Sequence, residues 1–354
     1  MASLRDIAKR AGVSPTAVSL VLNGKAADAR IGAGTVERIL ACAQELNYRP
    51  DHFARSLRTR RSGLVGVVVW DIADPYVGEI LQGIERGLRA RQYGTMLCDA
   101  DGSDDGLRRC FEEFERIPVE GLLLIEGSPD RGAELYHGKA PMVVLARREE
   151  NVGIGSVTVD NHQGGRIAAV HLIGRGYQDL LHITRVQRAP DEEERLQGFL
   201  MATAPATAAT TTAATTTAAP GTAAAPGATP LIRSRVVELP DYEKGVEEAI
   251  VEALRHRTGS LGVFAVNDLM AMVAVRTVVD RGVSIPESVG VIGFDDLNFS
   301  RYLTPRLTTI RQPRFEMGRS AADLLLRRLS GGNETGDDTA HIVLAPELTV
   351  RESA

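Results

Sequence analysis

The sequence has few cysteines and no long apolar run, and these absences exclude several classes of protein. Its three cysteines, Cys42, Cys98 and Cys110, cannot all pair and do not have the spacing of a metal site. We therefore expect reduced thiols, not a disulfide scaffold, and no bound metal or other cofactor. Arg5 and Asp6 interrupt the N-terminus, where a signal peptide needs an apolar core. Together these features predict a cytoplasmic chain without a membrane span.

The signatures of common enzyme classes are missing as well. Gly153 and Gly155 lack the third glycine and the strand-to-helix setting of a dinucleotide site, and the sequence contains no GxxxxGK[ST], HExxH or GxSxG motif. The seven histidines are scattered, and neither His162 nor His171 has a partner at metal-ligand spacing. We therefore expect no catalytic residues and no enzymatic activity.

What is present is an ordinary globular composition with an uneven distribution of charge. The 354 residues are 44% hydrophobic and 25% charged, which suffices for two or three domains with their own cores. Residues 1–62 carry 11 basic and 5 acidic side chains, a net charge of +6, whereas the remainder carries 30 basic and 41 acidic side chains, a net charge of −11. This asymmetry indicates that the N-terminal part contacts a polyanion and that the rest has another task.

Residues 3–46 have the pattern of three short amphipathic helices. A capping box begins the first helix at Ser3, and Gly12 ends it. Ser14 and Pro15 start the second helix, and a third is expected from about residue 35 to 46. The apolar positions that can bury one another are Leu4, Ile7, Ala8, Ala11, Val18, Val21, Leu22, Val36, Ile39, Leu40, Ala43 and Leu46. Two short helices joined by a tight glycine turn predict a helix-turn-helix.

The second helix of such a unit enters the DNA major groove, where its N-terminal residues face base edges. Thr16 and Ser19 can exchange hydrogen bonds with bases, whereas Ala17 and Leu20 offer only apolar contact, for instance to thymine methyl groups. Ser14 is expected to act mainly as the N-cap and can still touch a phosphate. The candidate DNA-binding residues of this unit are Ser14, Pro15, Thr16, Ala17, Ser19, Leu20 and Asn23.

The next segment, RPDHFARSLRTRRSG at 49–63, contains five arginines suited to phosphate contact. Leu57 lies at helical spacing from Ala54 and matches a wedge between base steps of the minor groove. The alternative is a solvated basic linker, and both hold if this short helix forms only on DNA. Its candidate DNA-binding residues are Arg49, Ala54, Arg55 and Leu57.

From residue 63 onward, apolar runs alternate with longer helical patterns. Strands are expected at 64–70, 95–99, 121–125, 142–146, 156–160, 179–183, 235–239, 262–266 and 289–294. Nearly continuous apolar strands separated by amphipathic helices are typical of parallel sheets covered on both faces. The fold class is therefore an all-α helix-turn-helix head followed by an α/β body of two doubly wound parallel sheets. A ligand of such sheets binds outside the carboxyl ends of their strands.

One segment interrupts this alternation. Residues 202–230 consist of 13 Ala, 10 Thr, 4 Pro and 2 Gly, without charge or large apolar side chains. We expect a disordered or loosely extended surface insertion between a helix that ends near Met201 and a strand that begins near Arg235. A tethering role is the alternative.

These motifs together resemble the lactose/galactose repressor (LacI/GalR) family. The runs LRDIAKRAGVSPTAVSLVLNG and ELNYRPDHFARSL are similar to its DNA-binding head and hinge across residues 3–62. In the body, VGVVVWDIADPYVGEILQGIERGLRARQY resembles the start of the family's effector domain, and FAVNDLMAMVAV resembles the helix after its Asn-Asp pair. VIGFDDLNFSRYLTPRLTTIRQP resembles its most recognisable strand and loop, and LAPELTVRES resembles its closing strand. The resemblance covers nearly the whole chain.

The resemblance implies a transcriptional regulator, expected to be a repressor, that binds a near-palindromic double-stranded DNA operator as a homodimer. It implies a body of two subdomains like a periplasmic sugar-binding protein, crossed by the chain three times. The expected boundaries are 1–48 for the head, 49–62 for the hinge helix and linker, 63–354 for the effector-binding and dimerisation domain, 63–161 with 294–318 for its first subdomain, and 162–293 with 319–354 for its second.

The resemblance also places an effector site in the cleft between the subdomains. It assigns effector contact to Tyr76, Asp160, Arg195, Tyr242, Asn267 and Asp295. Carboxylate and amide oxygens accept from hydroxyl groups, a guanidinium donates in a fixed fork, and an aromatic ring covers the apolar side of a sugar. The expected effector is therefore a sugar or sugar derivative. Purely structural roles are the alternative, because Asn267 can simply cap a helix and Asp295 can hold a loop.

The sequence departs from the family pattern at three places. Leu20 stands where several members have an arginine that reads guanine, so the operator sequence is not predicted. The family's stacking aromatic has no clear counterpart, because Pro240 lies near that place and Tyr242 is two residues away. The acidic run 191–194 suggests a cationic or amino-sugar effector, but a solvated helix start is the favoured explanation, because acidic residues stabilise the first turn of a helix.

Functions of other classes are disfavoured. A solute-binding transport protein would share the body but needs an export signal and carries no basic helix-turn-helix. A sugar-modifying enzyme would need a catalytic carboxylate or a phosphate loop. Within the regulator class, purine or other non-sugar effectors and effector-independent action remain open.

Overall fold

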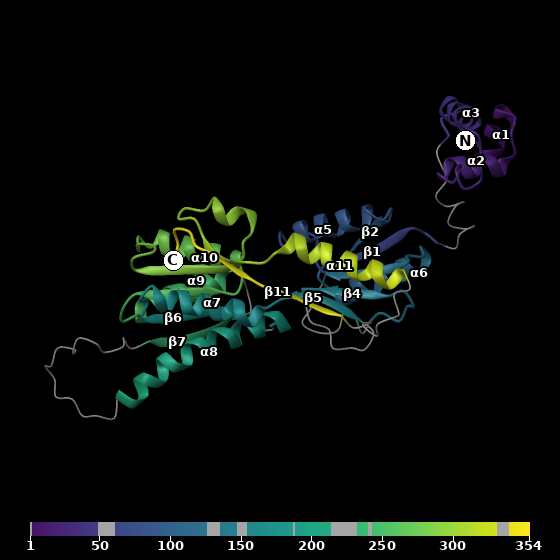
Figure 1. The fold of residues 1–354 in the computed structure, drawn as a ribbon. Helices are drawn as coiled ribbons and strands as arrows, with labels where there is room; N and C mark the ends of the chain where they lie inside the picture. Colours follow the sequence, from purple (N-terminus) through teal and green to yellow (C-terminus); the bar gives the residue numbers. More distant parts are fainter. Residues whose placement is uncertain are drawn as a thin grey trace. The chain divides into compact units, whose positions relative to one another are not determined.

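The computed structural model describes residues 2–48, 61–125, 135–146, 154–186, 188–213, 232–239, 243–330 and 340–354 (Figure 1). Its residues form two compact units, Met1–Ser62 and Gly63–Ala354. The first unit is the expected three-helix head, and the second is the α/β body.

The head consists of α1 (Leu4–Ala11), α2 (Pro15–Leu22) and α3 (Ala33–Glu45). Ser3 and Asp6 form the predicted capping box, and Gly12 ends α1 in the left-handed conformation with φ of 66°. Glycine adopts this backbone geometry without steric cost. The core residues of the head are Ile7, Ala8, Ala11, Val18, Val21, Ile39, Cys42 and Ala43.

The third helix differs from the prediction in its start and in its buried face. It begins at Ala33, two residues early. Leu40, expected in the core, is 48% exposed, and Cys42 is buried instead. Leu40 follows the fully buried Ile39 and therefore lies about 100° further round the helix.

The first sheet of the body has six strands in the order β11-β5-β4-β3-β1-β2, all paired in parallel. Its strands are β1 (Leu64–Val69), β2 (Gly94–Asp99), β3 (Gly121–Ile125), β4 (Met142–Leu145), β5 (Gly155–Val159) and β11 (His341–Leu344). Its helices are α5 (Val77–Arg89), α6 (Asp104–Arg116) and α11 (Arg314–Leu329). Successive side chains of β1 point to opposite faces, so Val67 packs with the cluster of α5 and α11 while Val68 packs with that of α6.

Glycines let α5 and α11 pack unusually close together. A Cβ atom added to Gly318 on α11 would lie 2.0 Å from the carbonyl oxygen of Ile80 on α5. The reverse holds at Gly83, where an added Cβ would lie 2.1 Å from the carbonyl oxygen of Phe315. Glycine has no Cβ atom, and this absence allows the backbones of the two helices to approach so closely.

The second sheet also has six strands, in the order β12-β10-β9-β8-β6-β7. Its strands are β6 (Asp179–Arg185), β7 (Arg233–Leu239), β8 (Leu261–Ala265), β9 (Val289–Asp295), β10 (Thr308–Arg311) and β12 (Glu347–Thr349). Its helices are α7 (Asn161–Gly174), α8 (Pro190–Ala213), α9 (Glu243–His256), α10 (Asp268–Asp280) and the 3-10 helix η2 (Asn298–Arg301). Every strand pair is parallel except β10 with β12, so the predicted doubly wound architecture is confirmed.

The chain passes between the two sheets three times, after β5, after β10 and after β11. The subdomain ranges nevertheless differ from those expected at the third and fourth segments. Residues 294–318 were expected in the first subdomain, yet β10 pairs with β9 in the second sheet. Residues 319–354 were expected in the second subdomain, yet α11 packs on α5 and β11 pairs with β5 in the first. The expected single closing strand is two strands, one in each sheet.

Helix α8 extends into the segment of Ala, Thr, Pro and Gly. It was expected to end near Met201 but continues to Ala213, because alanine is the best helix former and the first turns are anchored by buried residues such as Phe199. The remainder of the insertion, 214–230, lies outside the described residues. Although α8 is long, neither it nor another described helix is apolar enough to cross a membrane.

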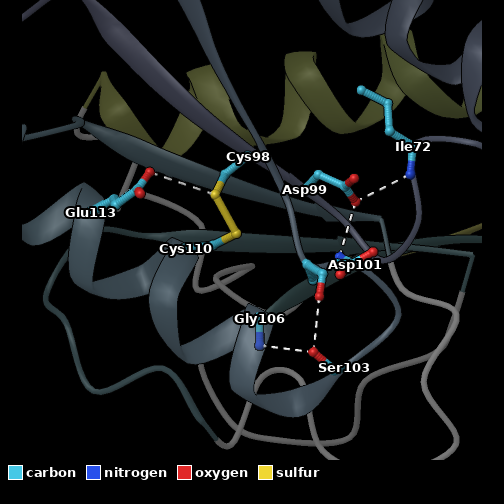
Figure 2. Close-up of a disulfide and its surroundings, with 9 residues drawn as sticks. Ile72, Cys98, Asp99, Asp101, Ser103, Gly106, Cys110 and Glu113 are labelled. Carbon is cyan, nitrogen blue, oxygen red and sulfur yellow. Dashed lines mark hydrogen bonds between the residues drawn. A yellow bond between two sulfur atoms is a disulfide. The ribbon is translucent and has the colours of Figure 1, made fainter.

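Two of the three cysteines form a disulfide, which corrects the expectation of reduced thiols. Cys98 on β2 and Cys110 on α6 are bonded (Figure 2), with their Cα atoms 5.7 Å apart. Cys42 is free and buried. Helix α6 packs against β2, and this brings two cysteines that are 12 positions apart in the sequence within bonding distance. In the same turn, the Asp99 carboxylate accepts from the backbone N–H groups of Ile72 and Asp101 (Figure 2).

Candidate functional site

The first candidate site is the exposed start of α2 in the head. Ser14 is the N-cap, and its hydroxyl accepts a hydrogen bond of 3.2 Å from the Ala17 N–H. Pro15 and Thr16 are exposed, while Val18 is buried on the opposite side of the helix. The first turn of α2 therefore presents a proline ring and a hydroxyl to solvent on a helix held rigidly from behind.

Further along α2, two of the predicted DNA-binding residues, Ser19 and Asn23, are hydrogen-bonded to each other. The Asn23 amide donates to the Ser19 carbonyl oxygen at 2.6 Å and to its hydroxyl at 3.3 Å, at the end of the helix. Leu20 is half-buried. The predicted hinge residues Arg49, Ala54, Arg55 and Leu57 lie outside the described residues.

The second candidate site is a cavity of about 150 Å³ at the carboxyl ends of strands from both sheets, which we call the cleft. Its position follows the general rule for doubly wound sheets. The lining residues are Trp70, Asp71, Asp74, Tyr76, Val77, Ile125, Ala146, Arg185, Ala189, Asp191, Glu192, Arg195, Asn267, Leu269, Asp295, Leu297 and Gln312.

Four of the six predicted effector residues lie together in this lining. They are Tyr76, Arg195, Asn267 and Asp295. Asp160 is not among the lining residues, because it is the exposed N-cap of α7, where its carboxylate accepts from the Gln163 N–H at 2.8 Å. Tyr242 lies outside the described residues.

Arg195 is held from three directions. Its Nε donates to the Asn161 side-chain oxygen at 3.0 Å, Nη1 to the Val266 carbonyl oxygen at 2.8 Å, and Nη2 to the Asp191 carboxylate at 2.9 Å. The side chain is buried, with its guanidinium carbon 3.8 Å from the centre of the Phe294 ring. Three of its five N–H groups are thus used within the protein, and the planar fork is fixed before a ligand arrives.

Asp295 ends β9 in a strained conformation, with φ of 117°. Its Oδ1 atom accepts from the Gln312 amide at 2.6 Å, and the Arg314 guanidinium donates to its backbone carbonyl at 2.8 Å. Burial raises the pKa of Asp295 to about 8, although Arg195 and Arg314 oppose this rise. A buried carboxyl is therefore fixed at the wall of the cavity.

Tyr76, Gln312 and Asp295 form a hydrogen-bond chain across the cleft. The Tyr76 hydroxyl donates to the Gln312 side-chain oxygen at 3.2 Å, and the Gln312 amide donates in turn to Asp295. Burial raises the pKa of the Tyr76 hydroxyl, so it remains a donor. The chain joins the first subdomain to the second through a residue on the connection between β10 and α11.

Asn267 caps α10, since its side-chain oxygen accepts from the Met270 N–H at 2.9 Å, and it also lines the cavity. The adjacent Asp268 lies behind the cavity wall. Its carboxylate accepts from the Ser300 hydroxyl and the Thr309 hydroxyl at 2.6 Å each and from the Leu297 N–H at 2.8 Å. Burial raises the pKa of Asp268 to about 6. This buried carboxyl ties the loop after β9 to α10.

Several lining residues were not anticipated. The additional polar residues are Trp70, Asp71, Asp74, Arg185, Asp191, Glu192 and Gln312. Trp70 and Asp71 directly follow β1 and Arg185 ends β6, so their places after apolar strands are a signal that could have found them. A larger hollow of about 800 Å³ lies over α10 near Tyr302, and no predicted effector residue lines it.

The acidic run 191–194 is not a solvated helix start. Glu192 is buried and accepts from the Arg185 guanidinium, while Asp191 pairs with Arg195. Both acidic residues line the cavity. Glu193 pairs with Arg188 outside it. As for metals, the described residues contain no cluster of three or more His, Cys, Asp or Glu side chains that could hold an ion.

Comparison with known proteins links both sites to one family. Residues 3–51 match the family model of bacterial regulatory proteins of the lacI family, and residues 169–354 match that of the periplasmic binding protein-like domain. The HTH-type transcriptional repressor PurR of Pectobacterium carotovorum is 30% identical over 359 residues, covering 100% of this chain and 97% of that protein.

Solved structures of lacI-family proteins are also similar to this chain. A LacI family transcriptional regulator from Enterococcus faecium with bound ribose is 25% identical, with a TM-score of 0.66 over 82% of this chain and 98% of that one. The lac repressor dimer bound to operator and the anti-inducer ONPF has a TM-score of 0.79 at 22% identity, over 99% of this chain and 98% of that one. At 22% identity, the similarity to the lac repressor dimer shows the fold alone.

Proposed function

The chain belongs to the lacI family of bacterial regulatory proteins, and from this premise we propose that it is a sequence-specific DNA-binding repressor whose operator affinity is controlled by a small effector. Like the repressors of this family, it is a regulator and not an enzyme. It acts in the cytoplasm as a homodimer on a near-palindromic operator, because a two-fold dimer places two recognition helices on symmetric half-sites.

The exposed first turn of α2 is the observation that carries the DNA-binding function. Pro15 and Thr16 face solvent while Val18 and Val21 fix the helix in the head core. Thr16 is assigned to base contact and Ser14, through its backbone N–H or hydroxyl, to phosphate. Leu57 of the hinge is assigned to the minor-groove wedge on the strength of the family resemblance.

The effector site is the cleft. Tyr76, Arg195, Asn267 and Asp295 are assigned to contact a sugar or sugar derivative, because the cavity offers carboxylate and amide acceptors, a fixed guanidinium and an aromatic ring. The regulator with bound ribose supports this class of ligand. A volume of about 150 Å³ is below that of pockets for drug-sized molecules, in keeping with a small ligand.

The mechanism is thermodynamic linkage between the cleft and the head. The Tyr76–Gln312–Asp295 chain spans the two subdomains, so a ligand that contacts both walls favours one relative arrangement of them. If the two arrangements differ in DNA affinity, the ligand changes operator binding by no more than its own differential affinity.

Selection of bound fragments from random-sequence DNA tests this function. The purified chain is incubated at about 0.15 M salt, where binding through phosphates alone is weakened. We expect enrichment of one near-palindrome, with or without candidate effectors. Random recovered sequences under both conditions would refute the regulator function.

Two matched variants sharpen the experiment. Thr16→Ala removes the exposed hydroxyl from the first turn of α2 and should weaken binding to the selected operator about 10-fold or change the preferred base at one position of each half-site. Gln44→Ala, an exposed uncharged position on α3, should bind like the parent protein. Equal behaviour of the two variants would exclude Thr16 from base contact.

A further inference from the structure

The charge of the cleft is unbalanced. Its lining contains the five carboxylates of Asp71, Asp74, Asp191, Glu192 and Asp295, but only the two guanidinium groups of Arg185 and Arg195. A cavity that recognises phosphate or carboxylate ligands needs the opposite excess, since these ligands are bound by cations and N–H donors.

Both arginines are already paired with carboxylates of the same lining. Arg185 donates to both carboxylate oxygens of Glu192, at 2.8 and 3.0 Å from its Nε. Arg195 forms an ion pair of 2.9 Å with Asp191. The positive charge that the protein supplies to the cleft is therefore matched by Glu192 and Asp191.

The other three carboxylates have no such partner. Within the described residues, no ion pair closer than 4.0 Å includes Asp71, Asp74 or Asp295. Asp71 and Asp74 each use one oxygen to accept from the backbone of their own loop, from Ala73 N–H at 2.8 Å and from Tyr76 N–H at 2.9 Å. The negative charges of Asp71 and Asp74, and the buried carboxyl group of Asp295, whose pKa burial raises to about 8, thus remain around one small cavity.

Asp295 is the most deeply placed of the three. It is only 6% exposed and lines the cavity, and its hydrogen bond from Gln312 uses Oδ1. No described side chain donates to Oδ2. Oδ2 is not one of the buried atoms that lack a partner, so it is accessible from the cavity, and an ammonium group placed there would stabilise the ionised carboxylate.

The pKa values of these groups respond to the crowding. Burial raises the pKa of Asp74, and the neighbouring Asp71 carboxylate raises it further, while Arg185 only partly opposes this rise. Burial also raises the pKa of Glu192, with Asp191 as the next cause. A positive charge inside the cavity would stabilise the ionised form of each group.

From this arrangement we infer that the cleft takes a polyhydroxyl ligand carrying a protonated amine, such as an amino sugar, in preference to its neutral and phosphorylated analogues. The inference rests on the proposed effector function of the cleft and specifies the ligand class. An ammonium group is a donor of three hydrogen bonds and accepts none, which suits Asp295 Oδ2 and the carboxylates of the 71–74 loop. A phosphate group would meet carboxylates and two arginines that are already paired.

Trp70 provides a direct readout, because it is the only tryptophan of the chain and lines the cleft. Full-length protein is titrated at pH 7 with matched sets of hexoses and pentoses, each as the neutral sugar, the amino-deoxy sugar and the sugar phosphate, while Trp70 fluorescence and heat of binding are followed. We expect an amino-deoxy sugar to bind at least 10-fold more tightly than its neutral counterpart, and the phosphates to bind most weakly. A neutral sugar or a phosphate that binds as tightly as the best amine, or no response to any amine, overturns the inference.

Charge variants test the cause of the preference. Asp74→Asn removes one negative charge from the lining without changing the size of the side chain, so the preference for the amine over the neutral sugar should fall about 10-fold. Glu112→Gln removes one charge from the exposed face of α6, outside the cleft, and should leave the preference unchanged. An unaltered preference in Asp74→Asn would overturn the electrostatic explanation.

The selection of DNA, with and without candidate effectors, separates this inference from the proposed function. A chain that enriches a near-palindrome but prefers neutral sugars would remain a repressor with a different ligand. A chain that binds amino sugars but enriches no DNA sequence would retain the ligand class and lose the regulator function.

Discussion

Arg195 lies over the ring of Phe294, with its guanidinium carbon 3.8 Å from the ring centre. The ring belongs to β9 and the arginine to α8, so the contact fixes the arginine to the strand that also carries Asp295. Cation–π contact of this kind strengthens when both groups are removed from water, as they are here. The guanidinium is therefore a rigid part of the cleft wall.

Two substitutions of Arg195 should separate its contribution to the free energy of unfolding from its contribution to the effector response. Arg195→Ala leaves Asp191 and Asn161 without their donor and should lower the free energy of unfolding by about 3 kcal/mol, measured by urea titration of Trp70 fluorescence. Arg195→Lys keeps the charge and loses the fork, so stability should fall less while effector response is still lost. Normal effector response in Arg195→Lys would show that the fork does not contact the ligand.

Asp295 should make the stability of the body depend on pH. Burial raises the pKa of its carboxyl to about 8 in the folded chain, from 3.8, so the folded state holds this proton more tightly than the unfolded state. The contribution of Asp295 is fully present below about pH 4 and is lost progressively as the pH rises to about 8. In Asp295→Asn the fall of stability over this range should therefore be smaller, while Glu112→Gln should follow the parent curve. Parallel curves for Asp295→Asn and the parent protein would contradict the raised pKa.

The disulfide between Cys98 and Cys110 predicts a definite thiol count. Alkylation of the unfolded protein followed by mass spectrometry should label only Cys42 without reductant and all three cysteines after reduction. Because the bond closes a loop of about 12 residues, reduction should lower the free energy of unfolding by about 2 to 3 kcal/mol. Cys98→Ser should have this lower stability from the outset and show no response to reductant. Three labelled cysteines in unreduced protein would exclude the bond.

Close contact of α5 and α11 predicts opposite effects for two glycine substitutions. Gly318→Ala places a methyl group 2.0 Å from the Ile80 carbonyl oxygen and should lower the free energy of unfolding by about 1 to 3 kcal/mol. Gly78→Ala, on the open face of α5, meets nothing within 4 Å and should raise it by about 0.5 to 1 kcal/mol. Thermal unfolding of both variants checks the pair, and equal melting temperatures would show that the helices can separate at no cost.

Local patterns predicted most of the fold. Ser3, Gly12 and Ser14 signal helix ends through their own side chains and backbone preferences, and apolar runs mark nine strands, so these features need no knowledge of distant residues. The assignment of two segments to subdomains failed because both sheets are mostly parallel and apolar, and a short run such as 308–311 fits either. Pairing is decided by contacts across the chain, among them the glycines between α5 and α11.

The residues of the cleft that were predicted are those that lie within a sequence motif of the family. Tyr76, Arg195, Asn267 and Asp295 lie in recognisable runs, and the structure brings them together. Gln312 lies in the segment that connects β10 to α11. The direction of its side chain depends on its partners Tyr76 and Asp295 in the two subdomains, and sequence patterns do not specify these contacts. Glu192 was expected in solvent because first-turn acidic residues usually are, and its burial depends on Arg185 reaching it from β6.

The three connections between the subdomains limit how the body can move. Two domains joined by one flexible segment can rotate about every axis, whereas three connections, after β5, β10 and β11, oppose twisting of one subdomain against the other. We therefore expect a ligand that contacts both walls of the cleft to change mainly the angle between the subdomains.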